Sequence, residues 1–208
     1  YHGKYLANRK DPPSQRLFAE TSLMVVWDDH EVADNFRAAH PLAPIGRRAF
    51  MDYWPVRQDP ADPERIYRTQ RWGKTAELFI LDTRQYRDES AATILGAAQM
   101  RWFLDALGKS DARFKFICTS VPFSSPNKDK WGGYPADRDA VVKALRDNQI
   151  SGVIFLSADV HYAAVARVAG VPGLREVITG PLAAQMGQGT GQEKRFEYFN
   201  NQHLNYGL

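Results

Sequence analysis

Short apolar runs separated by amphipathic segments constrain the fold of this 208-residue chain more than any other feature. Five runs have the length and β-branched content of buried strands, and each ends in polar or turn residues. They are LMVVW (23–27), ELFILD (77–82), FKFICTSV (114–121), GVIFLSAD (152–159) and LREVITG (174–180). Because segments with helical periodicity lie between them, we expect an α/β protein with central sheets covered by helices.

Two of the intervening segments have a clear apolar face. In residues 97–107 apolar side chains follow the i, i+3, i+4, i+7 spacing, and Gly108 is expected to end that helix. Residues 137–148 carry a similar face, and Pro135 and Asp137 suit the first turn of a helix.

The remaining segments are less regular. A third helix is expected over residues 46–54 (GRRAFMDYW). We expect loops at 1–15, where the polar start shows no signal-peptide pattern, and at 56–65 and 124–135. The glycine-rich stretch 187–208 is expected to be a loop that packs through its aromatic residues.

Composition excludes several classes of protein. Hydrophobic content of 44% and charged content of 25% are ordinary for a globular protein, and no apolar stretch approaches the length of a membrane span. The single cysteine, Cys118, rules out an internal disulfide, and its apolar surroundings indicate a core residue rather than a nucleophile. Since no repeat or linker divides the chain, we expect one domain over residues 1–208.

Two polar clusters follow two separate apolar runs. Asp28, Asp29 and His30 come directly after the run at 23–27. Asp159 is the last residue of the run at 152–159, and His161 follows two residues later. Functional groups gather at the carboxyl ends of strands in open α/β sheets. If residues 159–161 are extended, their alternate side chains point toward one centre.

The ligand types in these clusters favour a metal site. Carboxylate and imidazole suit calcium, manganese, iron and zinc, and a cation removes the repulsion between adjacent carboxylates. Asn35, Glu31 and Asp34 lie close to the first cluster, and Glu31 is equally suited to capping the segment that follows. Strand-end Asp–His pairs also occur as helix caps and hydrogen-bonded supports, so the pattern leaves both interpretations open.

Several motifs together resemble a known family. WDDHEVADN, ELFILDTRQYRD, ILGAAQMRWFLDAL, FICTSVPFS, KWGGYPADRDAVV and FLSADVHYAAV occur in the order found in the PhoD-like alkaline phosphatase/phosphodiesterase family of the calcineurin-like metallophosphoesterase superfamily. The resemblance runs from about residue 15 to residue 182. It implies a four-layer αββα sandwich of mixed sheets with a polynuclear metal centre at the strand ends. The family's first metal motifs have no counterpart here, so we expect part of a catalytic domain.

The resemblance also implies roles for individual residues. Asp29, Asp159 and His161 would be metal ligands, Asp28 and Asn35 would be ligands or orient ligands, and His30 would lie at the phosphate or protonate the leaving group. The family is associated with iron and calcium, with zinc or manganese as alternatives. No histidine occurs at 121–124, where the superfamily has a further ligand. Family members are commonly exported, which implies a periplasmic or secreted location.

These roles predict hydrolysis of phosphate monoesters or diesters by a metal-activated water. Arg84 is the candidate phosphate contact, with pairing to Asp82 or Asp88 as the alternative. Trp72, Trp131 and Tyr134 either line a substrate mouth or belong to the core.

Two other functions stay open on sequence alone. The sequence is also compatible with a catalytically inactive α/β fragment or binding module, and with a nucleic-acid-binding domain that uses the arginine-rich stretch 65–87. Much of that stretch is expected to be strand, and it carries no recognised reading motif.

Overall fold

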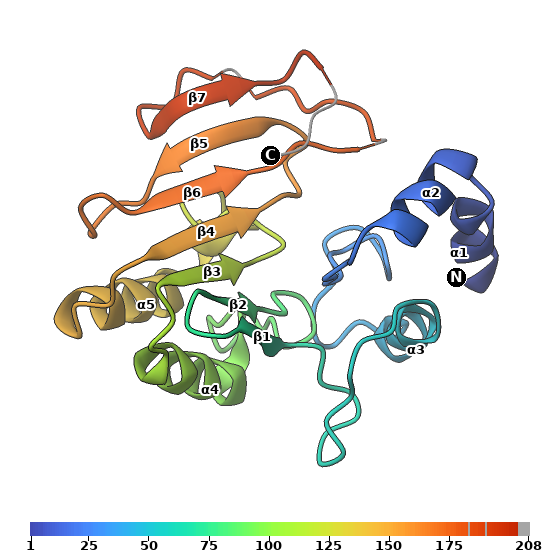
Figure 1. Ribbon diagram of the computed structural model, residues 1–208, viewed down its shortest axis with the longest axis horizontal. Helices are drawn as coiled ribbons and strands as arrows, with labels where there is room; N and C mark the ends of the chain where they lie inside the picture. The colour runs from blue at the N-terminus through green and yellow to red at the C-terminus, as the bar shows by residue number, and fades with distance from the viewer. Residues whose placement is uncertain (183, 190, 204–208) are drawn as a thin grey trace.

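The computed structural model describes residues 1–182, 184–189 and 191–203 (Figure 1). Helices precede and flank a sheet of seven strands. In chain order the elements are α1 (His2–Arg9), α2 (Pro12–Glu20), α3 (Ala43–Tyr53), β1 (Arg68–Trp72), β2 (Ala76–Ile80), α4 (Gly96–Lys109), β3 (Phe114–Cys118), the 3-10 helix η1 (Trp131–Gly133), α5 (Pro135–Asp147), β4 (Val153–Ser157), β5 (Ala163–Arg167), β6 (Arg175–Ile178) and β7 (Phe196–Asn200).

The sheet is mixed, in the order β1-β2-β3-β4-β6-β5-β7. Strands β2, β3, β4 and β6 run parallel, whereas β1 pairs antiparallel with β2, and β5 pairs antiparallel with both β6 and β7. Parallel neighbours end at the same edge of a sheet. The segments that follow β2, β3 and β4 therefore meet at one place.

The main core lies between β2–β4 and the helices α4 and α5, which pack side by side below these strands in Figure 1. Phe79, Ile117 and Phe155 from the three strands are fully buried there with Phe103 of α4. The two amphipathic patterns are thus confirmed as helices. Gly108 does not end the first of them, because α4 continues to Lys109 and the capping contact is made by Ser110.

A second core is built around Trp27, Phe36 and Phe50, and it includes α3, the predicted third helix. The prediction of a strand over 23–27 is wrong: the run is not part of any described strand, and Leu23 and Met24 are exposed. Its apolar composition instead buries Trp27 against the rings of Phe36 and Phe50. The apolar composition of this run correctly indicated burial of Trp27. It did not indicate a strand, because strand formation also needs a hydrogen-bonded neighbouring strand.

The expected loop at 1–15 is also wrong, because α1 and α2 occupy most of it. Asp11 caps α2 by accepting a hydrogen bond from the backbone N–H of Ser14 (2.9 Å), and Pro12 fills the first helical position. This Asp–Pro signal was present in the sequence. Tyr5 stacks on Tyr53 of α3 with a centroid distance of 4.9 Å, which holds α1 against the second core.

At the other end of the sheet, β5 and β7 were not predicted. β7 lies inside the expected loop at 187–208, of which residues 190 and 204–208 fall outside the described residues. The expected aromatic packing is present, since Tyr162 contacts the rings of Phe196 and Phe199. The segments 56–65 and 124–135 are loops as expected, apart from an isolated bridge and η1.

The α/β class is therefore confirmed. The described residues form one sheet, with α4 and α5 against one of its faces, so the full four-layer arrangement stays a prediction, as does a single domain over 1–208. Among the described residues, no helix has the length and apolar character of a membrane span.

Candidate metal centre

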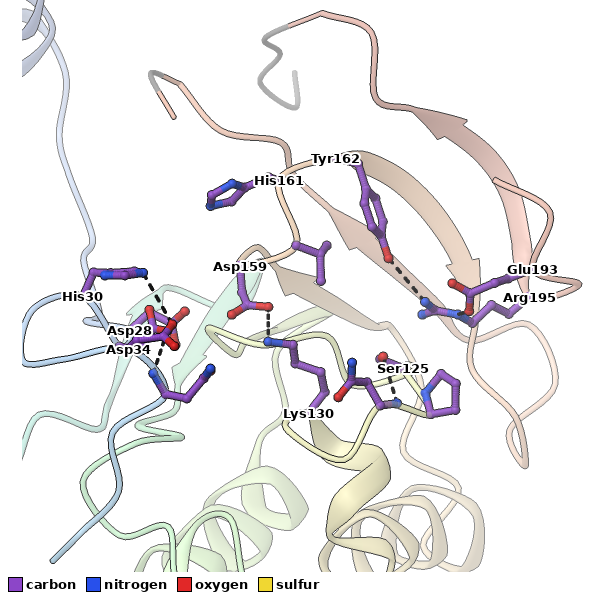
Figure 2. Close-up of a pocket in the computed structure, with 15 residues that line it drawn as sticks. Asp28, His30, Asp34, Ser125, Lys130, Asp159, His161, Tyr162, Glu193 and Arg195 are labelled. Atoms are coloured by element: carbon purple, nitrogen blue, oxygen red, sulfur yellow. Dashed lines mark hydrogen bonds and ion pairs between the residues drawn. The ribbon is translucent and has the colours of Figure 1, made fainter. Parts of the chain in front are cut away.

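Four segments meet at a cavity of about 730 Å³ at the carboxyl end of the parallel strands. Residues 28–35 form one wall, and the rest of the lining comes from the segments that follow β3 and β4 and the segment that precedes β7. Figure 2 shows Asp159 and Lys130 joined near the middle, with His30 on one side and Arg195 on the other. The segment after β2 reaches the same carboxylates through Arg84.

Three carboxylates converge at this point. Asp28, Asp29 and Asp159 each offer an oxygen, and these oxygens lie within 4.8 Å of one another. The same criterion groups Asp29 with His30 and Asp34. The fold thus brings together the predicted aspartates from residues 28–29 and from the end of β4.

Arg84 supplies positive charge to this cluster from a fully buried position. Its Nε donates to Asp28 Oδ1 (2.7 Å), and its Nη2 donates to Asp159 Oδ1 (3.3 Å) and lies 3.8 Å from Asp29 Oδ2. The guanidinium therefore pairs with carboxylates other than the Asp82 and Asp88 considered from sequence. Only the backbone N–H of Arg84 reaches Asp82.

Lys130 is a second cation, which the sequence analysis did not single out. Its Nζ donates to Asp129 Oδ2 (2.9 Å) and forms an ion pair with Asp159 Oδ2, and only 11% of the side chain is exposed. Lysines in polar loops are mostly solvated, so the sequence Lys128-Asp129-Lys130 does not by itself indicate a buried ion pair. The neighbouring Trp131, fully buried in the main core, is what fixes this part of the loop.

The backbone around the cavity is strained at three predicted site residues. Asn35, Asp159 and His161 have φ values of 52°, 67° and 57°, in the left-handed region that non-glycine residues seldom adopt. Such strain tends to cluster at functional sites. It also overturns the expectation that 159–161 is extended, because this segment is a turn after β4.

The remaining predicted residues surround the cluster at different distances. The backbone N–H of Asn35 donates to Asp29 Oδ2 (3.1 Å), which orients that carboxylate. His30 lies at the rim with 78% of its side chain exposed, and its Nε2 is 3.8 Å from Asp34 Oδ1. His161 lines the cavity but is not part of either acidic group among the described residues.

Glu31 has the capping geometry that the sequence analysis kept open. Its Oε2 accepts a hydrogen bond from the backbone N–H of Asp28 (2.9 Å). Burial raises the pKa of Glu31, and the negative charges of Asp28 and Asp29 act in the same direction. We infer that Glu31 stabilises the turn that presents the two aspartates.

The electrostatic environment shifts the pKa values of Asp29 and Asp159 in opposite directions. Burial alone would raise the pKa of Asp29, but the Asn35 N–H, Arg84 and His30 outweigh it and hold the pKa below its usual value. Burial and the charge of Asp28 raise the pKa of Asp159 to about 6, although Lys130 and Arg84 oppose this rise. The pKa of Asp159 therefore stays raised even though the side chain pairs with both cations, because burial and the neighbouring Asp28 outweigh them.

The wall opposite His30 comes from the segments that follow β3 and precede β7. Arg195 donates to Ser124 Oγ (2.6 Å) and to Glu193 Oε2 (2.6 Å), and it lines the cavity with Tyr162. Neither Arg195 nor Glu193 was predicted from sequence, because they lie in the stretch that was interpreted as an unstructured loop. Of the three aromatic residues considered for a substrate mouth, Trp131 and Tyr134 are buried in the core and Trp72 is an exposed residue of the edge strand β1.

Comparison with known proteins shows the family of the chain. A family model described as PhoD-like phosphatase matches residues 1–207. The chain belongs to the PhoD-like phosphatase family. Alkaline phosphatase D of Bacillus subtilis (strain 168) is 29% identical over 201 residues, which covers 77% of this chain and 34% of that protein.

A solved structure of PhoD has the same fold. It superposes with a TM-score of 0.72 over 85% of this chain and 45% of that chain, at 23% sequence identity. The chain thus spans less than half the length of these relatives.

Proposed function

We propose that the chain forms part of a metal-dependent phosphate ester hydrolase. The observation that carries this proposal is the convergence of Asp28, Asp29 and Asp159 within 4.8 Å, at the edge of a cavity and at the carboxyl ends of the strands. Membership of the PhoD-like phosphatase family supports the same reaction class. Monoesters and diesters are both within the proposal.

The residues present fit a hard cation. The donors are carboxylate oxygens, partly buried and drawn from two separate segments, and calcium and trivalent iron favour such oxygen ligands. We propose calcium and iron as the ions, with zinc or manganese as alternatives, and Asp28, Asp29 and Asp159 as the holding residues, with Asn35 and His161 beside them. A bound cation would supply Lewis acidity, polarising a phosphoryl oxygen and lowering the pKa of a water molecule.

Side chains of this chain would stabilise the transition state and protonate the leaving group. Arg84 and Lys130 bring positive charge to the cavity, where negative charge develops on the phosphoryl oxygens in the transition state. In this arrangement Arg84 acts mainly by holding Asp28 and Asp159, and a direct phosphate contact by Arg84 stays a proposal. His30, exposed at the rim, is placed to orient the ester or to protonate the departing oxygen.

A leaving-group series tests this assignment. Hydrolysis of p-nitrophenyl phosphate, bis-p-nitrophenyl phosphate and an alkyl phosphate would be measured with and without added calcium and iron. We expect chelator-sensitive hydrolysis, and we expect His30→Ala to slow the alkyl ester by about 10²- to 10⁴-fold but the activated esters far less. Equal losses on all three esters would contradict the acid role, and hydrolysis that persists after chelation would contradict metal dependence.

One observation favours the alternative of an inactive fragment or binding module. Arg84 and Lys130 already neutralise much of the negative charge of the cluster, which is what a purely structural ion-pair network does. That alternative predicts a folded chain that binds no metal.

Nucleic-acid binding through residues 65–87 finds no support in the geometry. Arg84 and Arg87 are buried, Arg65 pairs with Asp59, and Arg71 pairs with Asp111, so these residues do not form one exposed basic face. Placement outside the cytoplasm stays a prediction that rests on the family resemblance.

A further inference from the structure

Asp82, in the segment that follows β2, is a fully buried carboxylate. Its Oδ1 accepts three hydrogen bonds, from the indole Nε1 of Trp27 (2.9 Å) and from the backbone N–H groups of Arg84 (3.0 Å) and Gln85 (3.0 Å). Its Oδ2 is buried and has no hydrogen-bond partner, and no ion pair to Asp82 occurs among the described residues. Burying a carboxylate oxygen without a hydrogen-bond partner costs folding free energy, so we expect Asp82 to have a role beyond packing.

The position of Asp82 is itself fixed by α4. The backbone N–H of Asp82 donates to Gln99 Oε1 (2.8 Å), and Gln99 Nε2 donates back to the carbonyl of Asp82 (2.8 Å). Gln99 is also fully buried. The backbone of Asp82 is therefore fixed by hydrogen bonds to a helix of the main core, and this fixes the position of its carboxylate.

The three donors belong to two segments that are far apart in sequence and meet at the acidic cluster. Trp27 immediately precedes Asp28, and the turn at Arg84 carries the guanidinium that donates to Asp28 Oδ1 (2.7 Å). Trp27, Asp82, Arg84 and Asp28 thus form a closed ring of contacts. Any shift of Asp82 changes the distance between Asp28 and the Arg84 side chain.

We propose that Asp82 is a positioning residue for the candidate metal centre, because one oxygen ties the Trp27–Asp28 segment to the Arg84 turn. Outer residues that orient ligands typically change metal affinity by about 10- to 100-fold. The expected change in metal affinity rests on the proposed function. The expected change in the position of the Arg84 side chain does not require a bound metal.

The test uses four variants of the full chain and two readouts. Asp82→Ala removes the acceptor, whereas Asp82→Asn keeps one acceptor oxygen and Trp27→Phe removes a single donor while preserving a ring. Asp137→Ala is the matched control, since the Asp137 carboxylate also accepts three hydrogen bonds, from Thr93 Oγ1, Ile94 N and Leu95 N, but lies outside the cavity. The readouts are Ca²⁺ affinity by calorimetry and the Arg84 Nε–H resonance by NMR.

We expect Trp27→Phe and Asp82→Ala to weaken Ca²⁺ binding by about tenfold and to move the Arg84 Nε–H resonance. Asp82→Asn should keep both readouts close to wild type, and Asp137→Ala should change neither even if it lowers thermal stability. An unchanged Arg84 resonance in Trp27→Phe and Asp82→Ala, or an equal change in Asp137→Ala, would overturn the proposal. If wild type binds no Ca²⁺ but the Arg84 resonance responds as expected, the proposed function fails and the positioning role stands.

Discussion

At the residue scale, the site is a balance between carboxylates and the chain's own cations. Like charges within 5 Å repel strongly in a partly buried site. Here Arg84 and Lys130 lie among Asp28, Asp29 and Asp159, so the cluster is held together without any added ion. The same oxygens are the proposed metal ligands, so Lys130 would compete with a metal for Asp159.

Replacement of Lys130 tests this competition. Lys130→Met removes the ammonium group that pairs with Asp159, so Ca²⁺ affinity is expected to rise by about three- to tenfold, a small part of the full Coulomb interaction. Isothermal titration calorimetry measures the change. Lys128→Met is the control, because Lys128 is exposed in the same loop. A fall in affinity for Lys130→Met, or the same change in both variants, would contradict the competition.

The raised pKa of Asp159 predicts a pH dependence of stability. A carboxylate whose folded pKa of about 6 exceeds its ordinary 3.8 binds more protons in the folded state, so its stabilising contribution is complete below pH 3.8 and is lost as the pH rises through 6. The difference in unfolding free energy between wild type and Asp159→Asn should fall by about 1 to 3 kcal/mol over this window and stay level above pH 7. Urea denaturation of the metal-free proteins at several pH values measures it. A difference that increases with pH would show that the pKa is lowered instead.

At the element scale, the parallel strands fix where the site residues emerge, so the turns that begin those strands matter. Gly152, before β4, has a φ of +71°, and a Cβ there would lie 2.0 Å from the carbonyl oxygen of Arg113. Its own carbonyl accepts a hydrogen bond from Lys115 of β3 (2.8 Å). The residue therefore sets the pairing of β3 with β4, and with it the position of Asp159.

Alanine substitutions distinguish the cost of the left-handed φ at Gly152 from the cost of its close approach to the Arg113 carbonyl. Gly152→Ala combines a left-handed φ with a clash against backbone and should lower stability by about 2 to 4 kcal/mol. Gly73→Ala, in the β1–β2 turn, has a φ of +54° but open space around the Cβ, and should cost about 1 kcal/mol. Thermal and urea unfolding give both values. Equal losses would mean that the close approach to Arg113 is unimportant.

The sequence was most informative for elements with a strong period or a β-branched run. Four of the five apolar runs contain strands, and all three expected helices are present. β5 was missed because AAVAR is rich in alanine and has little strand propensity. The run at 23–27 was misassigned because strand formation depends on a partner, which the run itself does not encode.

The candidate site was predictable only in part for the same reason. The carboxylates at 28–29 and 159 stand next to apolar runs, and that local signal was enough to find them. The roles of Lys130, Asp82 and Arg195 depend on contacts between residues 29 to 71 positions apart in sequence. These contacts are Lys130–Asp159, Trp27–Asp82 and Ser124–Arg195. Such contacts are set by the tertiary fold and leave no local pattern.

At the scale of the whole molecule, the chain combines a seven-stranded mixed sheet with two acidic segments, and it spans less than half the length of the relatives compared. We propose that the chain holds metal by itself. Three carboxylates from two segments, with Asn35 orienting Asp29 and Arg84 holding Asp28, would then be a preorganised set of oxygen ligands.

The most direct measurement is the metal content of the purified chain by elemental analysis, after equilibration with calcium and iron and removal of unbound ions. We predict about one metal ion or more per wild-type chain, and a near-complete loss in the double variant Asp28→Asn/Asp159→Asn, with circular dichroism showing that both proteins are folded. A folded wild-type chain without metal, or equal metal in the double variant, would contradict the account.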